Sequence, residues 1–226
     1  MHHLIELDPT RKLARVQPGL IYDDLNRAAA KHQLAFGPDP STHSHCTIGG
    51  MIGNNSCGLH SVMASFAGTG ARTSDNLHLI RERYPKIPRR VSGYNLDDLL
   101  PEKGFHVARA LTGSEGTCVT VLEATVHLVY SPPIRALVAL GYPDVYTVAD
   151  HVPEILQFRP VGLEGIDELL IDGMKKKKMH PEDFELLPPG AGWLLVEFGG
   201  ETKEEADAHA VRSLLCYACT GTNSLP

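Results

Sequence analysis

The residues whose types and spacing could do chemistry are concentrated between Phe36 and Gly58. This segment is dominated by Gly, Pro, Asn, Ser and Thr, and five of its residues are glycine. Glycine lets backbone approach a bulky ligand closely and adopt positive φ, while Asn, Ser and Thr add short hydrogen-bonding side chains. Consecutive backbone amides in such a loop can form an anion-binding nest suited to a pyrophosphate. The composition therefore indicates either a ligand-binding loop or a merely irregular surface loop.

Two common phosphate-binding motifs are excluded for this segment. It is not Gly-x-x-x-x-Gly-Lys-Ser/Thr, and it is not Gly-x-Gly-x-x-Gly after a strand. Its histidines and cysteines raise a second hypothesis, because His43, His45, Cys46 and Cys57, with His60, could be drawn as a zinc site. Their spacing matches no standard zinc finger and they are interleaved with the glycines, so we predict no metal here.

Hydrophobic periodicity predicts the elements that must position this segment. Before residue 131, these are strands at 5–7 and 13–16, a helix at 21–32, irregular backbone at 37–58 and a half-buried strand at 119–128. The sequence Ser131-Pro132-Pro133 indicates a domain boundary. After it, strands at 135–140, 161–165 and 193–198 alternate with helices at 145–157 and 167–178, and a capping box at Thr202 and Glu205 opens a last helix. This pattern predicts one sheet with helices on one face.

The order of the motifs carries a resemblance to a known family. The motifs are Val16-Gln17-Pro18-Gly19, Pro38-Asp39-Pro40-Ser41, Thr47-Ile48-Gly49-Gly50, Asn54-Asn55-Ser56-Cys57-Gly58, Ser92-Gly93-Tyr94-Asn95-Leu96 and Gly113-Ser114-Glu115-Gly116-Thr117. In this order, over roughly residues 5–200, they resemble the FAD-linked oxidase and D-lactate dehydrogenase family, which has the vanillyl-alcohol-oxidase (VAO/PCMH) type of FAD-binding fold.

The resemblance implies an α+β fold: part of a VAO/PCMH-type FAD-binding domain at 1–131, then part of a ferredoxin-like cap domain at 132–226. It implies FAD as the cofactor, with residues 38–41 and 47–50 along the diphosphate and ribityl chain. In some relatives a histidine in this loop carries the flavin covalently, which makes His43 and His45 candidates. The cofactor-binding residues that it implies are Pro38, Asp39, Pro40, Ser41, Thr47, Gly49, Gly50, Gly53, Asn54, Asn55, Gly58, Gly113, Ser114, Glu115, Gly116 and Val119.

The activity implied by the resemblance is oxidation of a small 2-hydroxy acid, such as D-lactate or D-2-hydroxyglutarate, by an FAD-dependent dehydrogenase. Electrons would pass to an iron–sulfur module or a quinone. No residue can be named as catalytic; Arg89 and Arg90 are the nearby cations, and a solvated role is favoured for both. A net charge of −6 argues against a nucleic-acid partner. No apolar run approaches the roughly 20 residues of a membrane span, so we expect a cytoplasmic or membrane-peripheral enzyme.

Departures from the family lead to a further expectation. Relatives place another FAD subdomain before this region and a helical sector with catalytic histidines after it. We therefore expect an incomplete chain that binds flavin weakly at most and turns over no 2-hydroxy acid by itself. The alternative is a non-catalytic remnant of such a flavoprotein that cannot hold FAD alone.

Two expectations concern single residues. Gly49 and Gly50 should let backbone approach the diphosphate, so Gly50→Val should abolish flavin retention, because a bulky β-branched side chain cannot share that space or a positive φ. Glu115 should be buried or half-buried and accept backbone hydrogen bonds, because a buried carboxylate without partners is costly.

Overall fold

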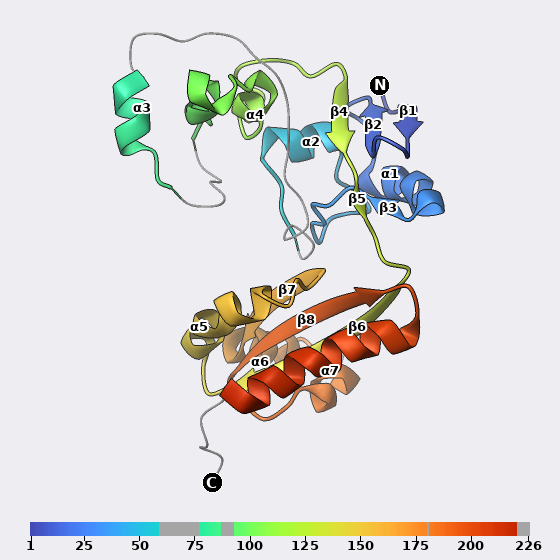
Figure 1. The fold of residues 1–226 in the computed structure, drawn as a ribbon, viewed down its shortest axis with the longest axis vertical. Helices are drawn as coiled ribbons and strands as arrows, with labels where there is room; N and C mark the ends of the chain where they lie inside the picture. Colours follow the sequence, from blue (N-terminus) through green and yellow to red (C-terminus); the bar gives the residue numbers. More distant parts are fainter. Residues whose placement is uncertain (59–76, 87–92, 180, 221–226) are drawn as a thin grey trace. The chain divides into compact units, whose positions relative to one another are not determined.

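The computed structural model describes residues 1–58, 77–86, 93–179 and 181–220, and side-chain surroundings as far as residue 214. Within it the chain divides into two compact units, Met1–Tyr130 and Ser131–Pro226. Each unit has its own hydrophobic core. The two units are described separately below, following the labels of Figure 1.

The first unit contains a three-stranded antiparallel sheet with the order β1-β2-β4. Its strands are β1 (Leu4–Asp8), β2 (Leu13–Val16) and β4 (Ala124–His127). Ala14 and Val126 are paired across β2 and β4, and both are buried, because alternate side chains of a strand point to the same face. The prediction of a strand at 119–128 is confirmed only from Ala124 onward.

Helix α1 (Tyr22–Ala29) covers this core with the face that carries Leu25 and Ala29, both fully buried. A 3-10 turn, η1 (Ala30–His32), continues it and ends at Gln33, whose φ is 55°. The short strands β3 (Leu34–Ala35) and β5 (Val129–Tyr130) then pair antiparallel. The predicted helix at 21–32 is therefore confirmed, with its last turn tightened.

The glycine-rich segment contains a short helix that the sequence did not predict, α2 (Ile48–Gly53). Thr47 caps it, because its hydroxyl accepts a hydrogen bond from the Gly50 amide at 3.2 Å. Ile48 and Met51 point into the core and anchor the helix. The prediction of irregular backbone throughout 37–58 is wrong over these six residues, because glycines hid the helical period.

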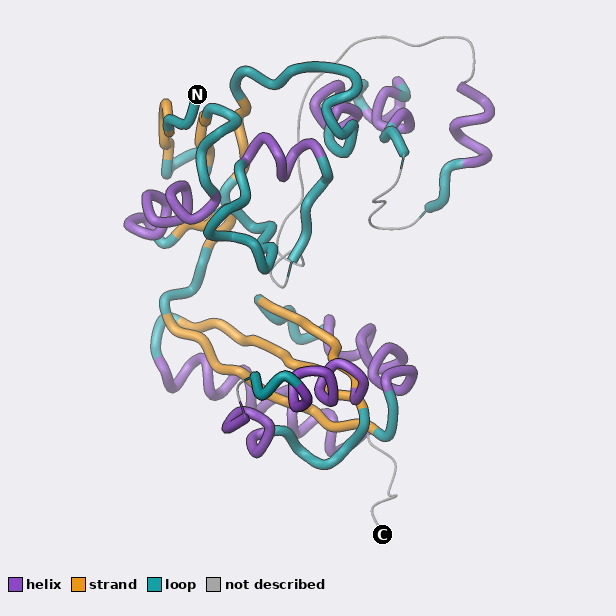
Figure 2. The backbone as a smooth tube through the Cα atoms, turned by 180° about the vertical axis from the view of Figure 1, so that it is seen from behind, coloured by secondary structure: helices purple, strands orange, loops and turns teal. Residues whose placement is uncertain are grey.

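Short helices follow in the described part of 77–123. They are α3 (Leu77–Arg83), η3 (Leu96–Leu99), η4 (Pro101–Lys103) and α4 (Val107–Leu111). Arg81 of α3 donates to Glu102 of η4 at 2.6 and 3.0 Å, which lowers the pKa of Glu102 to about 2. From α4 the chain runs as loop to the start of β4 (Figure 2). Arg89 and Arg90 lie outside the described residues.

The second unit is built on a three-stranded antiparallel sheet with the order β6-β8-β7 (Figure 1). Its strands are β6 (Ile134–Tyr142), β7 (Gly162–Asp167) and β8 (Gly192–Gly200). Its helices are α5 (Val145–Leu156), α6 (Glu168–Lys176) and α7 (Lys203–Thr220), with the 3-10 helix η5 (Pro181–Leu186) after α6.

One face of this sheet forms the core of the second unit. Val138 pairs with Val196 across β6 and β8, and these side chains pack with Ile155 of α5 and Ala210 of α7. The last strand in sequence therefore lies between the first two, and α5 and α7 cover the same face. This arrangement is the one expected of part of a ferredoxin-like cap.

Side-chain caps begin the helices of the second unit. Asp144 accepts from the Thr147 amide at 2.7 Å, and Asp167 accepts from the Leu170 amide at 2.8 Å. The cap predicted at Thr202 is confirmed, because its hydroxyl accepts from the Glu205 amide at 3.2 Å; the Glu205 side chain accepts from the Glu201 amide at 2.8 Å, one residue before the cap that a capping box would use. No helix within the described ranges is long and apolar enough to cross a membrane.

Candidate cofactor-binding site

Two of the predicted motifs, Pro38–Ser41 and Asn54–Gly58, are packed against each other; together with Thr47–Gly50 they form the first predicted block, and Gly113–Thr117 forms the second. A Cβ added to Gly58 would lie 1.6 Å from the Asp39 carbonyl oxygen, so the two chain segments are in direct contact. Pro38 is buried, whereas the chain is exposed from Ser41 to His45. The Pro38–Ser41 segment is thus fixed to the far end of the glycine-rich loop, and Gly58 is required there because any side chain would clash.

Helix α2 does not offer the free nest of amides that the sequence suggested. The Ile48 amide donates to the Leu20 carbonyl at 2.9 Å, and the Gly49 amide donates to the Pro18 carbonyl at 2.8 Å. The third amide, of Gly50, is used by the Thr47 hydroxyl. The amides of these three consecutive residues therefore already donate to acceptors within the protein. The interpretation of Thr47–Gly50 as an anion-binding nest is wrong.

The glycines of α2 differ in what surrounds them. A Cβ at Gly49 would lie 2.5 Å from the Pro18 Cβ, so Gly49 allows close approach to the protein's own chain. At Gly50 the nearest atom would be the Thr47 hydroxyl at 3.1 Å. At Gly53 no atom of the described residues lies within 4 Å. None of the three has a positive φ, and of the three Gly53 leaves the most room for a Cβ among the described residues.

The second predicted block is joined to α2 by two backbone hydrogen bonds. The Gly113 amide donates to the Ile52 carbonyl at 2.8 Å, and the Glu115 amide donates to the Gly53 carbonyl at 2.9 Å. A Cβ at Gly113 would lie 3.3 Å from the Asn55 Cβ, which confirms how closely the two loops approach. The structure therefore brings together two glycine-rich loops that are about sixty residues apart in sequence.

Left-handed backbone is concentrated at this junction. Asn55 has a φ of 52°, Gly113 of 84°, Glu115 of 53° and Gly116 of 71°. Such conformations cost a non-glycine residue on the order of 1–2 kcal/mol, and they cluster at ligand-binding sites when the surroundings enforce them. A Cβ at Gly116, like one at Gly53, would meet no described atom within 4 Å.

Two expectations for the second block are wrong. Glu115 is exposed, and the contact it makes to α2 is through its backbone amide. The buried member is its neighbour Ser114, at 4% exposure, whose carbonyl accepts from the Thr117 hydroxyl at 2.6 Å. Val119 is exposed and precedes β4 by several residues, so it does not start a strand. Glu115 itself has a left-handed backbone, with a φ of 53°.

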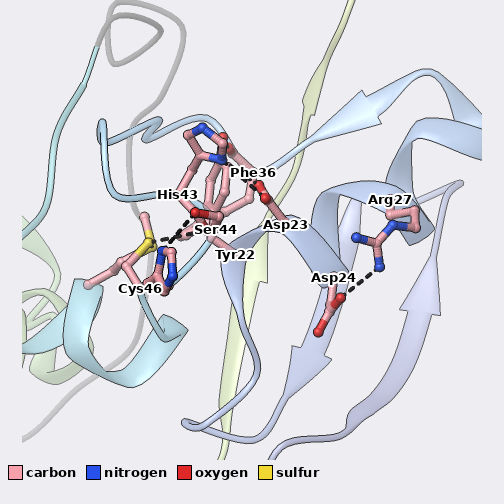
Figure 3. Close-up of polar contacts among 10 residues, drawn as sticks. Tyr22, Asp23, Asp24, Arg27, Phe36, His43, Ser44 and Cys46 are labelled. Atoms are coloured by element: carbon pink, nitrogen blue, oxygen red, sulfur yellow. Dashed lines mark hydrogen bonds and ion pairs between the residues drawn. The ribbon is translucent and has the colours of Figure 1, made fainter.

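The histidines of the first loop make local polar contacts, which Figure 3 shows. His43 Nδ1 lies 2.9 Å from one carboxylate oxygen of Asp23 and 3.1 Å from the other. His45 Nδ1 lies 2.8 Å from the Ser44 hydroxyl. Only Nδ1 of His43 contacts Asp23, so Nε2 takes no part in this interaction. The contacts of His45 do not favour it for covalent flavin attachment.

Tyr22 connects α1 to Phe36, at the start of the segment that leads into the glycine-rich loop. Its hydroxyl donates to the Phe36 carbonyl at 3.2 Å. Burial, assisted by the negative charge of Asp39, raises the pKa of this hydroxyl above its ordinary value. Burial also raises the pKa of the Cys46 thiol, which disfavours its thiolate form.

Across the described residues, which include His43, His45, Cys46 and Cys57, no group of three possible ligands lies close enough to hold a metal ion. His60 lies outside the described residues.

The joined loops fit an uncharged, close-packed cofactor surface better than an ionic one. The three blocks contain no Lys or Arg, and Asp39 and Glu115 are their charged members. At Gly53 and Gly116, beside the junction, a Cβ would meet no described atom within 4 Å. A flat, neutral ring system and a ribityl chain suit such a surface, while α2 by itself offers a diphosphate no free donors at its first three amides.

Comparison with known proteins agrees with this geometry. Residues 1–71 match the family model of an FAD binding domain. The chain is 27% identical over 256 residues to D-2-hydroxyglutarate dehydrogenase of Pseudomonas putida, a match that covers 92% of this chain and 25% of that protein. It is 29% identical over 220 residues to glycolate oxidase subunit GlcD of Escherichia coli K12, covering 95% of this chain and 41% of that protein.

The fold is also found among solved structures. An alkyldihydroxyacetonephosphate synthase matches with a TM-score of 0.60 and 18% identity, over 97% of this chain and 40% of that chain. The predicted resemblance and the fold are thereby confirmed: residues 1–71 match an FAD binding domain, whose cofactor is FAD, and the chain is similar in sequence to D-2-hydroxyglutarate dehydrogenase and GlcD and in fold to the synthase. The chain spans between 25% and 41% of the length of the two curated relatives.

Proposed function

We propose that this chain supplies part of the FAD site of a dehydrogenase that oxidises a small 2-hydroxy acid, such as D-lactate or D-2-hydroxyglutarate. The observation that carries the proposal is the junction between the two glycine-rich loops, made by the Gly113 and Glu115 amides on the carbonyls of α2. Both loops stand in the order in which the FAD-linked family has them, and their adjacency gives a single bare surface.

Within this proposal each part of the chain has a distinct task. Gly53 and Gly116 let the cofactor approach backbone closely, and Asn54 and Asn55 offer amide side chains beside them. Gly49 and Gly58 act indirectly, by packing the loop onto Pro18 and Asp39. FAD, when bound, supplies the acceptor for the hydride that leaves the hydroxyl-bearing carbon of the substrate.

The remaining assignments are also part of the proposal. The cofactor set comprises Pro38, Asp39, Pro40, Ser41, Thr47, Gly49, Gly50, Gly53, Asn54, Asn55, Gly58, Gly113, Ser114, Glu115, Gly116 and Val119, with Gly53 and Gly116 as its centre and Gly49, Glu115 and Val119 as its weakest members. We assign no catalytic residue. The electron acceptor would be an iron–sulfur module or a quinone, in a cytoplasmic or membrane-peripheral setting.

A second candidate function is a non-catalytic remnant that cannot hold FAD alone. One observation favours it: the first three amides of α2 are consumed inside the chain, so this loop lacks a ready diphosphate site. The two candidates differ in whether the purified chain binds FAD at all.

The binding test is a titration of residues 1–226 with FAD, in which binding is measured by the quenching of flavin fluorescence. Saturable binding at one FAD per chain supports the proposal, and the absence of saturation at any FAD concentration supports the remnant. Flavin mononucleotide and ADP, added separately as competitors, report which half of the cofactor the chain contacts.

The oxidation test uses the protein in its own cells. An antibody against residues 131–220 would capture it from the source organism, and reduction of a dye by D-2-hydroxyglutarate, D-lactate and glycolate would be measured. Reduction by one of these acids, and none by the L-enantiomer of the chiral ones, is the expected outcome. Captured flavoprotein that reduces dye with none of them would contradict the substrate class.

A further inference from the structure

The motif Ser92-Gly93-Tyr94-Asn95-Leu96 is one of those that resemble the FAD-linked family, and it is not part of the proposed cofactor set. Two of its side chains reach the cofactor loop at Gly113–Thr117 from opposite ends. The Asn95 amide nitrogen donates to the Thr112 carbonyl at 2.9 Å and lies 3.4 Å from the Arg109 carbonyl. It thus satisfies carbonyls at the end of α4, where a helix has no backbone donors left. This contact fixes the residue that immediately precedes Gly113.

Tyr94 holds the other end of the loop. Its hydroxyl lies 2.8 Å from the Thr117 hydroxyl, which in turn donates to the Ser114 carbonyl at 2.6 Å. A hydroxyl has one proton to donate, and Thr117 gives its proton to Ser114. Tyr94 is therefore the donor to Thr117. A directed chain of hydrogen bonds runs from the tyrosine, through the threonine, into the loop.

Tyr94 is itself anchored outside the loop. The Tyr84 hydroxyl donates to the Tyr94 carbonyl at 2.9 Å. Tyr94 is 44% exposed, and its hydroxyl is the group that contacts Thr117.

The loop needs such support because three of its residues are left-handed. Gly113 and Gly116 adopt this conformation without strain, but Glu115 at a φ of 53° does not. The amide of Glu115 must still point at the Gly53 carbonyl for the loops to join. Restraints on Thr112 and Thr117 hold both ends of this strained turn.

We propose that Tyr94 and Asn95 are positioning residues, which hold the Gly113–Thr117 loop in its left-handed conformation before FAD binds. The inference rests on the proposed function for its consequence, since preorganisation of the loop should strengthen cofactor binding. Neither residue is assigned a contact with the cofactor.

The first test needs no flavin. Hydrogen exchange of residues 112–118 is compared in the parent chain, Tyr94→Phe, and Tyr146→Phe, a matched control in α5 whose ring is 80% exposed. Tyr94→Phe should accelerate exchange of the Gly113 and Glu115 amides about tenfold, as expected when a local opening becomes cheaper. Tyr146→Phe should leave it unchanged. If these amides exchange at the same rate in Tyr94→Phe as in the parent, the proposal is overturned.

Variants at Thr117 separate the hydrogen-bond chain from simple packing. Thr117→Ser keeps the hydroxyl and should exchange like the parent, whereas Thr117→Val removes the bonds to both Tyr94 and Ser114 and should accelerate exchange at least as much as Tyr94→Phe. The double variant Tyr94→Phe/Thr117→Val should be no worse than Thr117→Val alone, because the tyrosine hydroxyl acts on the loop through Thr117. Additive effects would show that Tyr94 acts elsewhere and would overturn the inference.

The second test measures FAD affinity in the same variants. Tyr94→Phe should weaken FAD binding about tenfold, equal to about 1.4 kcal/mol, and Asn95→Asp should weaken it further because a carboxylate would face two carbonyls. Faster exchange with unchanged FAD affinity overturns the positioning role. If the parent binds no FAD, the proposed function fails, and the exchange experiment still decides whether Tyr94 holds the loop.

Discussion

Two glycines of the same short helix should respond in opposite ways to the same substitution. In Gly49→Ala the new methyl would lie 2.5 Å from the Pro18 Cβ and 3.0 Å from the Pro18 carbonyl oxygen. In Gly53→Ala it would meet no described atom within 4 Å. The pair therefore separates a glycine required by the fold from a glycine left open on the surface.

The expected magnitudes follow from these distances. Overpacking of this kind costs roughly 1–3 kcal/mol, and Pro18 has little freedom to move because its carbonyl also accepts the Gly49 amide. Alanine in a helix is favoured over glycine by roughly 0.5–1 kcal/mol, so Gly53→Ala should leave the fold unchanged or slightly more stable. Because the helix preference for alanine applies at both positions, Gly49→Ala should be the less stable variant by about 1–3 kcal/mol.

The assay must report on the first unit alone. Urea-dependent hydrogen exchange of peptides from residues 13–35 measures its unfolding free energy, since these residues form much of its core. The chain's single tryptophan, Trp193, lies in the second unit and gives an internal control by fluorescence. Equal stability of Gly49→Ala and the parent would refute the reasoning, as would a Gly53→Ala variant that is the less stable of the two.

Three further predictions concern titration and helix capping. Tyr22 has a raised pKa in the folded chain. Its contribution to stability is therefore complete below its unfolded pKa of about 10 and is lost as the pH rises above that value. In urea unfolding above that pH, the Tyr22→Phe variant should lose less stability than the parent. Asp144 has a lowered pKa because the Thr147 amide bonds its carboxylate, so its contribution is present above its unfolded pKa of about 3.9 and is lost as pH falls. The stability difference between the parent and Asp144→Asn, followed by Trp193 fluorescence, should therefore shrink in acid; a difference independent of pH would contradict this. Asp167→Ala removes the cap of α6 and should destabilise the second unit by about 0.5–2 kcal/mol in the same assay, with no change in the first unit.

The elements that have a clear hydrophobic period were predictable from the sequence. The strands of the second unit are largely apolar, as at 192–200. Its helices α5 and α7 begin after capping residues that are recognisable in the sequence, Asp144 and Thr202. Local rules act strongly in these segments, because side chains alternate in burial or satisfy nearby amides. The structure differs from the prediction there by one or two residues at the ends.

Helix α2 was missed because three of its six residues are glycine. Glycine carries no side chain to record a period, and it disfavours helix on average. The signal that was present is the cap, since Thr47 stands two residues before the first of three closely spaced glycines and directly precedes the apolar Ile48. A cap followed by buried Ile48 and Met51 outweighs the glycines once the core is available to pack against.

The junction of the two cofactor loops could not be predicted from residue types. The acceptors for Gly113 and Glu115 are backbone carbonyls, which every residue has, so the sequence carries no mark of the pairing. The error at Glu115 has the same origin: a non-glycine residue gives no sign that its φ is positive. The family resemblance supplied both blocks in order, and the fold supplied their contact.

The central claim is that the surface formed by α2 and the Gly113–Thr117 loop receives FAD. The most direct measurement is a two-dimensional amide NMR titration of the isotope-labelled chain with FAD, with flavin mononucleotide as the comparison. We predict that the amides whose resonances move most are those of Gly53, Asn54, Asn55, Gly113 and Gly116. Resonances of β6, β8 and α7 should stay in place. Saturable FAD binding that moves other amides, and leaves these five unchanged, would contradict the account.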